Sequence, residues 1–168
     1  VMKLLELNLR PRDICTRAAF ENAARVVAAT GGSTNGALHL PAMANECGSE
    51  FDLFDVAEIF KSTPYIADLK PGGKYVAKDM YEAGGVPMLL KVLLDGGYLH
   101  GDCMTVTGKT LAENVRHLPG LEEGQQIVHS FSNPIKKDGH IRILRGNLAP
   151  DGAVVAGEAR ADERFGFF

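Results

Sequence analysis

The sequence predicts an α/β protein that is rich in helices as far as about residue 124 and made of short strands after it. Two observations support this fold class. Through much of the first part, apolar residues recur every three or four positions, which is the spacing of one helix face. Beyond Pro119, short apolar runs alternate with turn-forming pairs such as Asp138-Gly139, a pattern typical of strands and their turns. We therefore place a boundary within Leu121–Gln126 and expect two domains, 1–124 and 125–168.

The first two helices are expected on either side of a glycine break. The apolar residues of Arg17–Ala29 fall on one stripe, and its charged residues lie on the opposite side. A second helix is predicted at Asn35–Cys47, where Pro41 should interrupt it early and Gly48 should end it. Ser33, just after the glycines, has the side chain of a helix N-cap. The many small residues of the second helix should allow close packing against a neighbour.

The elements expected after Cys47 are short, and glycine, proline or capping residues mark their ends. They are a helix capped by Asp52 and stopped by Pro64, a strand at Tyr65–Leu69, helices at Lys78–Ala83 and 86–95, a helix from Thr110 through Leu118, and strands at Ile127–Phe131, Gly139–Leu144 and Ala153–Val155. The helix at 86–95 is apolar on nearly every side and should be buried. So few strands bury little apolar surface by themselves, so the second domain should be incomplete.

Composition and charge exclude several functional classes. The chain has 168 residues, of which 45% are hydrophobic, and a net charge of -3 without a basic block. This balance gives no support for binding to nucleic acid or to an anionic membrane surface. No apolar run approaches the roughly 20 residues of a membrane-spanning helix, and no leader opens the chain, so a cytoplasmic protein is expected. The three cysteines form no Cys-x-x-Cys pair, which indicates small buried apolar residues instead of a disulfide framework or zinc site.

The segment Thr30–Gly36 is the strongest candidate for a functional site. A helix that begins here presents unpaired N–H groups and the positive end of its dipole, and the glycines would let an anion approach the backbone. The alternative is that the glycines end one helix and Ser33 caps the next, as in an ordinary helical hairpin.

Other polar residues give weaker signals, and no catalytic residue is assigned. The five histidines lack metal-ligand spacing, so no metal site is expected within this chain. His39 is expected to be hydrogen-bonded at a packing interface, or to face the same pocket as Ser33. His100, Asp102 and Cys103 form a polar loop with little support for acid–base or thiolate chemistry. The sequence contains no phosphate-binding loop, and nucleotide binding is rejected.

Eight segments, taken together and in order, resemble the middle of a dihydroxy-acid dehydratase. They are Pro11–Asp13, Ala19–Ala23, Gly31–Asn35, Leu38–Leu40, Asp68–Val76, Ala83–Pro87, His100–Thr110 and Arg145–Gly152. The resemblance implies removal of water from a 2,3-dihydroxy acid to give a 2-oxo acid in branched-chain amino-acid biosynthesis. Sugar-acid (aldonate) dehydratases of the same superfamily are an alternative, and a non-catalytic interaction module left by truncation is a second one.

The resemblance also implies a fold, cofactors and assembly. Residues 1–124 would be the helix-rich C-terminal part of a cluster-binding α/β domain, and 125–168 would be the first strands of a swivelling β-barrel domain. An iron–sulfur cluster and Mg²⁺ would take part in the reaction of the parent enzyme. The protein would be a homodimer or a higher homo-oligomer acting on a small dihydroxy acid.

Departures from the family pattern limit what is carried over. The family's cluster-cysteine motifs, magnesium ligands and C-terminal serine segment do not occur, so no ligand role is given to Cys15, Cys47 or Cys103. The stretch from 157 to 168 is atypical, and the chain is expected to be an internal fragment that is inactive by itself. Within it, Ser33, Thr34 and Asn35 are predicted to line the substrate side of the parent enzyme's pocket.

Overall fold

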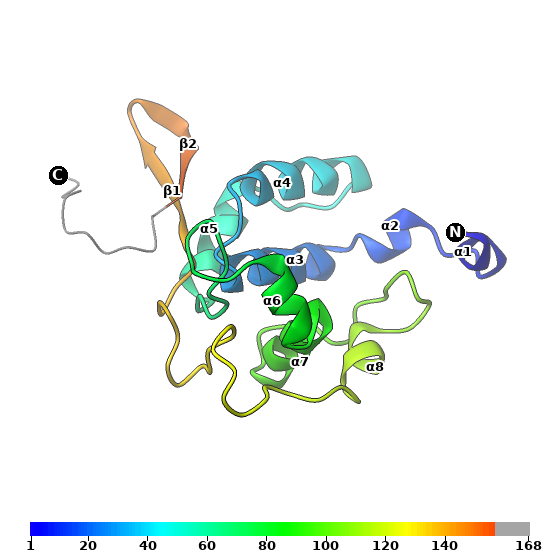
Figure 1. The fold of residues 1–168 in the computed structure, drawn as a ribbon. Helices are drawn as coiled ribbons and strands as arrows, with labels where there is room; N and C mark the ends of the chain where they lie inside the picture. The colour runs from blue at the N-terminus through cyan, green and yellow to red at the C-terminus, as the bar shows by residue number, and fades with distance from the viewer. Residues whose placement is uncertain (157–168) are drawn as a thin grey trace.

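A computed structural model describes residues 1–156 of the chain (Figure 1). The predicted atypical stretch from residue 157 lies outside the described residues. The elements in chain order are α1 (Met2–Glu6), α2 (Pro11–Ile14), α3 (Arg17–Ala29), α4 (Asn35–Cys47), α5 (Leu53–Lys61), α6 (Ala77–Glu82), α7 (Gly85–Asp95), α8 (Leu111–Val115), β1 (Ile141–Gly146) and β2 (Ala149–Ala156). None of the described helices is long and apolar enough to span a membrane.

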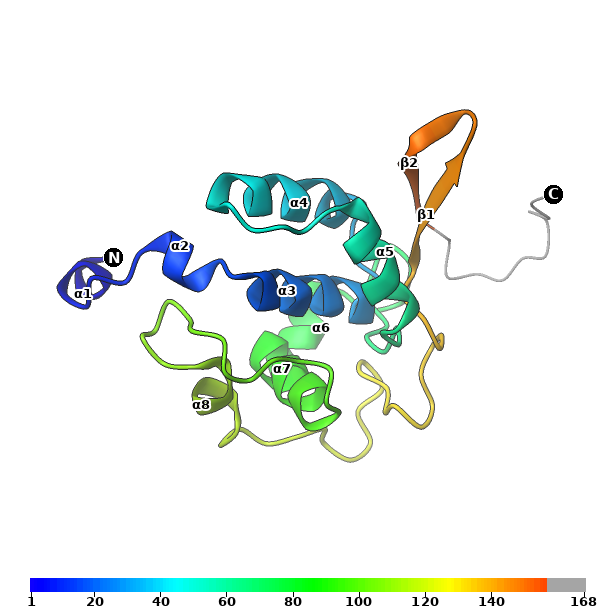
Figure 2. The same cartoon turned by 180° about the vertical axis from the view of Figure 1, so that it is seen from behind.

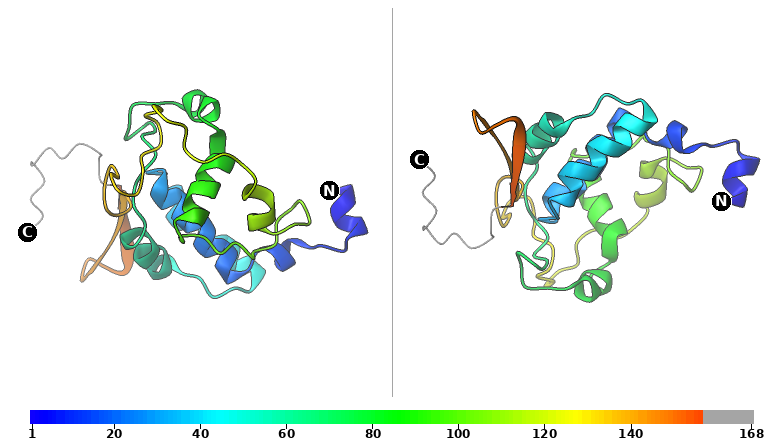
Figure 3. Two further views of the ribbon diagram at one scale, coloured as in Figure 1. Left: turned by 90° about the horizontal axis from the view of Figure 1, so that it is seen from below. Right: turned by 90° about the horizontal axis from the view of Figure 1, so that it is seen from above.

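Helix α3 runs through the middle of the helical part. Helices α4 and α5 pack on one side of it, and α6, α7 and α8 lie on the other side (Figures 1 and 2). In the view from below, α7 lies in front of α3 and crosses it, and in the view from above α4 lies in front of α3 (Figure 3). This arrangement divides the apolar core into two clusters, one on each side of α3.

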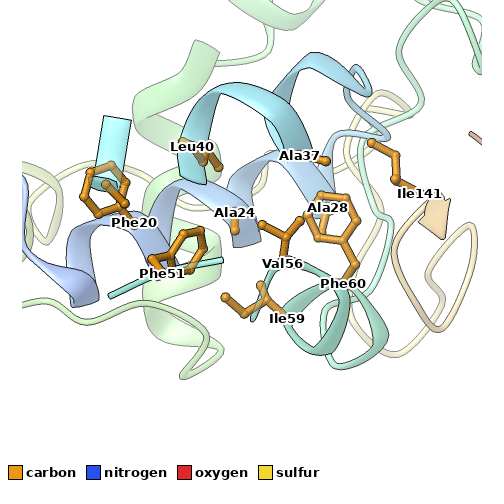
Figure 4. Packing of buried hydrophobic residues seen from close by; sticks show 11 residues of the cluster. Phe20, Ala24, Ala28, Ala37, Leu40, Phe51, Val56, Ile59, Phe60 and Ile141 are labelled. Atoms are coloured by element: carbon orange, nitrogen blue, oxygen red, sulfur yellow. The ribbon is translucent and has the colours of Figure 1, made fainter. Parts of the chain in front are cut away.

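The first cluster joins α3, α4, α5 and the start of β1. Its buried members include Phe20, Leu40, Phe60 and Ile141, and Val56 lies between them with no exposed surface (Figure 4). Alanines on the facing sides of α3 and α4 let the two helix backbones come close, as the small residues of the second predicted helix indicated. This packing fixes the start of α4 relative to α3.

The second cluster lies between α3 and the buried face of α7. It includes Ile66, Leu89 and Leu93, none of which has exposed surface, and Val128 from the segment after the predicted boundary. The prediction that the helix at 86–95 is buried is confirmed for most of its apolar residues, although Val86 at its first turn is 55% exposed. Residues on both sides of the predicted boundary thus share one core.

The helix predictions are largely confirmed, with two corrections. Pro41 does not interrupt the second helix, which continues to Cys47. Proline removes one backbone hydrogen bond, but Leu40 and Ala44 beside it are buried against the first cluster, and this packing holds the helix together. The short helix from Thr110 ends at Val115 instead of Leu118. Its capping box of Thr110 and Glu113 forms as predicted.

Two of the predicted strands do not form. Tyr65–Leu69 makes only isolated bridges, to Lys136, Val128 and Tyr75, and Ile127–Phe131 contributes only the bridge at Val128. The backbone groups of 65–69 bond to several separate segments in turn, so no continuous ladder develops. A run of five apolar residues does not show whether a strand will form, because pairing also depends on a continuous partner strand.

The last two predicted strands are confirmed as an antiparallel hairpin. Strands β1 and β2 pair in the register Ile143 with Val154, and a bulge interrupts the ladder between Leu144 and Gly146. Ile143 and Val154 pack against the first cluster, and the Arg145 guanidinium lies 4.9 Å from the ring centre of Phe54 on α5. The described chain is therefore a mixture of helices with a two-stranded antiparallel sheet, consistent with the α/β class.

Candidate functional site

The glycine break forms the short connection between the end of α3 and the start of α4. Gly31 has φ +62°, and a Cβ atom added to it would lie 2.6 Å from Cε2 of Tyr65. The left-handed backbone and the Tyr65 ring therefore both require glycine at this position. Ser33, Thr34 and Asn35 follow with exposed side chains, so the structure brings the three predicted site residues together on the surface.

Ser33 is not the N-cap that the sequence indicated. The N-cap of α4 is Thr34, which already has helical dihedral angles (φ -55°, ψ -21°) and makes no side-chain capping bond. The Ser33 hydroxyl oxygen instead accepts a hydrogen bond from the Asn35 N–H at 3.2 Å. The Ser33 carbonyl accepts from Gly36 N–H, so a tight turn comes one residue earlier than a standard cap.

No acidic residue lies in the first turn of α4. The positive end of its dipole is therefore not neutralised by a carboxylate of its own helix. The side chains exposed at this start are short and polar, whereas the Tyr65 ring fills the space beside Gly31. This is a start suited to a carboxylate from outside the helix.

Beneath the turn lies a buried hydroxyl group. Tyr65 is only 1% exposed, and its hydroxyl oxygen has no hydrogen-bond partner among the described residues. The ring packs beside His140, with ring centres 5.8 Å apart. Sequence reasoning placed Tyr65 in a strand and gave no reason to connect it with a glycine 34 positions earlier.

The outward face of α4 is largely apolar. Leu38 is 66% exposed and Met43 is 49% exposed, and His39 beside them is exposed as well. The expectation that His39 is hydrogen-bonded at a packing interface is therefore wrong within the described residues. It lies on the face of α4 that points away from α3 and α5.

The polar loop at 100–103 is organised differently from the sequence expectation. His100 pairs with Glu21 of α3, at 2.7 Å between Nε2 and Oε2, instead of with its neighbour Asp102. The buried Asn22 side chain holds the His100 backbone through two hydrogen bonds, of 2.8 and 3.0 Å. Arg17 then joins Glu21 to Asp55 of α5. This network ties α3 to the loop and to α5. Sequence reasoning could not find it, because Glu21 and His100 are 79 positions apart.

Burial raises the pKa of the Cys103 thiol, with further contributions from the charges of Asp102 and Glu21. A thiol with a raised pKa is a poorer nucleophile at neutral pH, because less of it is ionised. The raised pKa of Cys103 is consistent with the prediction that thiolate chemistry at this loop has little support. All three cysteines are half-buried, so the expectation of full burial is only partly met.

A polar cleft of about 510 Å³ lies where the turn at 68–75 meets the segment 121–133. Its lining includes Asp68, Lys74, Glu122, His129 and Asn133, and none of the predicted site residues is among them. Within residues 1–156, no group of three or more His, Cys, Asp or Glu side chains is placed to hold a metal ion.

Comparison with known proteins gives matches along nearly the whole chain. Residues 1–114 match the family model for the N-terminal region of dihydroxy-acid/6-phosphogluconate dehydratases, and residues 126–167 match the model for their C-terminal region. The chain is 62% identical over 165 residues to "Dihydroxy-acid dehydratase 2" of Bradyrhizobium diazoefficiens, covering 98% of this chain and 29% of the relative.

A second relative gives the same picture. The chain is 65% identical over 155 residues to "Dihydroxy-acid dehydratase" of Parvibaculum lavamentivorans, covering 92% of this chain and 27% of that protein. The chain thus spans less than a third of the length of these two relatives.

Proposed function

Because the chain belongs to the dihydroxy-acid/6-phosphogluconate dehydratase family, we propose that it is part of a dihydroxy-acid dehydratase. The observation that carries the proposal is the identity of 62% over 98% of the chain to a protein of that name. The reaction would remove the hydroxyl group from C3 and the proton from C2 of a 2,3-dihydroxy acid. The resulting enol would become the 2-oxo acid. The names of the matched relatives favour this substrate class over aldonates.

In this proposal the start of α4 holds the carboxylate end of the substrate. Ser33, Thr34 and Asn35 would line the pocket, with the hydroxyl groups of Ser33 and Thr34 and the side-chain amide of Asn35 as donors. Two observations support the assignment: the first turn has no carboxylate of its own, and the three side chains are exposed together. The dipole would orient the carboxylate and leave the C2–C3 bond turned toward other groups of the enzyme.

The described residues do not fit the iron–sulfur cluster and Mg²⁺ that the family resemblance implies. Within 1–156, no three potential ligands are grouped, and Cys103 lies among different residues from Cys15 and Cys47. We propose that the ligands of both cofactors belong to parts of the parent enzyme that this chain does not contain. The chain's own contribution would be to bind and orient the substrate.

A cytoplasmic homodimer or higher homo-oligomer is proposed for the parent enzyme. The apolar residues exposed on α4 and on α1, among them Leu38, Met43 and Leu5, are the kind of surface that is covered in an assembled protein. The same surface is what a non-catalytic interaction module would use, so activity must decide between the two.

The test of the proposed function uses the full-length enzyme with 2,3-dihydroxyisovalerate. Ser33→Ala should lower turnover at least several-fold while the enzyme keeps its secondary structure and its unfolding midpoint. Unchanged kinetics would return Ser33 to a structural role in the turn. The 168-residue chain alone, supplied with iron, sulfide and Mg²⁺, should form no 2-oxo acid. Measurable turnover would contradict the proposal that the cofactor ligands lie elsewhere.

A further inference from the structure

The first turn of α4 contains the one Asn-Gly pair of the sequence, Asn35-Gly36. Asn35 is exposed, and within the described part of the chain its side-chain amide makes no hydrogen bond. Gly36 has no side chain, so its backbone nitrogen is not shielded from the side-chain carbonyl carbon of Asn35. These two atoms can join in a succinimide ring, which is the first step of asparagine deamidation. Asn35-Gly36 is therefore a candidate for chemical modification.

The other asparagines of the chain lack this combination. The Asn22 side chain is buried and holds the His100 backbone through two hydrogen bonds, and three hydrogen bonds hold the side chain of Asn114. Asn133 precedes a proline, which has no N–H to lose. Leucine or glutamate follows each of the remaining exposed asparagines, which are Asn8, Asn45 and Asn147. The side chain of that next residue crowds the attacking nitrogen, so these three serve as internal references.

Ring closure requires the first turn of α4 to open. The Gly36 N–H donates a hydrogen bond to the Ser33 carbonyl at 3.0 Å, and this bond must break before the nitrogen can attack. The turn is weakly held. Its N-cap, Thr34, makes no side-chain capping bond, and Pro41 cannot donate the hydrogen bond that would close the next turn. Leu40 packs in the first cluster, so the first turn can open while the body of α4 stays in place.

We propose that Asn35 is a modification site, at which spontaneous deamidation proceeds through a succinimide ring formed with Gly36. The Gly36 nitrogen attacks the Cγ atom of Asn35, and the new bond between them closes the ring. The bond from Cγ to the side-chain nitrogen breaks, and this nitrogen leaves as ammonia with the proton of the Gly36 N–H. Water then opens the ring at either carbonyl and leaves aspartate or isoaspartate. The net reaction takes up water and releases ammonia, without oxidation or reduction.

Deamidation would change the charge at the start of α4. Aspartate at position 35 puts a carboxylate in a first turn that has none, where the helix dipole favours it. Isoaspartate adds a carbon atom to the backbone and would disturb the bond from the Gly36 N–H to the Ser33 carbonyl. Either product would weaken binding of a substrate carboxylate at this helix start. That consequence rests on the proposed function, whereas the modification itself does not.

The experiment incubates the 168-residue chain in mildly alkaline buffer and follows each asparagine by peptide mapping and mass spectrometry. The peptide that contains Asn35 should gain about 1 Da and separate into aspartate and isoaspartate forms. Asn35 should be modified at least about tenfold faster than the reference asparagines 8, 45 and 147. The proposal is overturned if Asn35 is modified no faster than these references. It is also overturned if Asn35 is modified in urea but not in the folded chain, because the first turn then stays closed.

Three single variants test the route of the reaction. Asn35→Gln should abolish the mass gain of this peptide, because glutamine would have to close a larger ring. Asn45→Gln is the matched control at the other end of α4 and should leave the rate at Asn35 unchanged.

Gly36→Ala tests the attacking residue. It should slow the modification at least about tenfold, because a Cβ atom crowds the nitrogen. That Cβ would lie 3.1 Å from Cγ1 of Val27, so any disturbance of the fold would open the turn and raise the rate instead of lowering it. A rate for Gly36→Ala equal to or above that of the native chain would contradict the succinimide route.

Discussion

Helices α4 and α5 are neighbours packed on the same side of α3, yet they begin in opposite ways. At the start of α5, the Asp52 carboxylate accepts hydrogen bonds from the N–H groups of Phe54 and Asp55, at 2.8 and 2.9 Å. The Asp55 carboxylate in turn accepts a hydrogen bond from the Asp52 N–H and pairs with Arg17. At the start of α4, one hydroxyl bond from Asn35 N–H to Ser33 is the side-chain contribution, and there is no carboxylate.

The two helix starts differ in how the helix dipole is compensated. Two acidic side chains compensate the dipole of α5 and use its first donors, so an external anion gains nothing there. The start of α4 has exposed polar side chains and an uncompensated dipole, and its backbone is held in place by a glycine that tolerates no side chain. We expect variants at these two starts to behave differently in stability and in catalysis.

The largest expected loss of stability comes from Gly31→Ala, because Gly31 lies in the connection that positions α4 relative to α3. A left-handed alanine costs about 1–2 kcal/mol, and overpacking against Tyr65 adds about 1–3 kcal/mol. Urea unfolding of the 168-residue chain should show this loss. Gly48→Ala is the matched control, with a similar φ but open space, and should lose only the about 1–2 kcal/mol of the left-handed alanine. Equal losses for the two variants would show that Tyr65 does not constrain the break.

A smaller effect separates the two caps directly. Asp52→Ala should lower the free energy of unfolding by about 1–2 kcal/mol, because two N–H groups lose their acceptor. Ser33→Ala should cost no more than about 0.5 kcal/mol, because it removes one exposed bond. Chemical denaturation of both variants gives the comparison. If Ser33→Ala cost as much as Asp52→Ala, the start of α4 would be a structural cap like that of α5.

Sequence reasoning predicted local features and missed the contacts between distant segments. Helices α3 and α4, the Asp52 cap and the final hairpin depend on periodicity, capping chemistry and turn residues, all of which are local. The assignment of Ser33, Thr34 and Asn35 to a substrate pocket came from the family resemblance and stays a prediction.

The pairing of Glu21 with His100 and the Tyr65 ring against Gly31 depend on tertiary packing, and no spacing rule indicates them. The same holds for 65–69, whose strand-like composition meets no continuous partner. The division at Leu121–Gln126 remains a prediction, because Val128 packs into a core that the earlier residues also build.

Adding a charge to the open helix start should stabilise it slightly. Asn35→Asp places a carboxylate at the first residue of α4 with little change of shape, and the dipole should make it favourable by about 0.3–1 kcal/mol. Asn45→Asp is the matched control, since it adds the same charge to an exposed position in the last turn, where the dipole is unfavourable. Unfolding in low salt should show a gain for the first variant and none for the second.

The smallest effect is the pH dependence at the closed helix start. The hydrogen bond from Arg17 lowers the pKa of Asp55 below its ordinary value. The ionised Asp55 therefore contributes its full amount to the free energy of unfolding above the unfolded carboxyl pKa of about 4. This contribution is lost as the pH falls through the lower pKa of the folded state. Asp55→Asn should flatten the acid limb of the stability curve by less than about 1 kcal/mol, since the pair is partly exposed. An acid limb identical to that of the native chain would contradict this origin.

The most direct test of the account is the kinetics of Asn35→Asp in the full-length enzyme with 2,3-dihydroxyisovalerate. If the start of α4 binds the substrate carboxylate, the added negative charge should lower kcat/KM at least about tenfold, equivalent to 1.4 kcal/mol, mainly through KM. Asn45→Asp, with the same charge at the other end of the helix, should leave kcat/KM within about twofold, well under 1 kcal/mol. Equal kinetic constants for both variants and the native enzyme would show that the substrate does not bind at this helix.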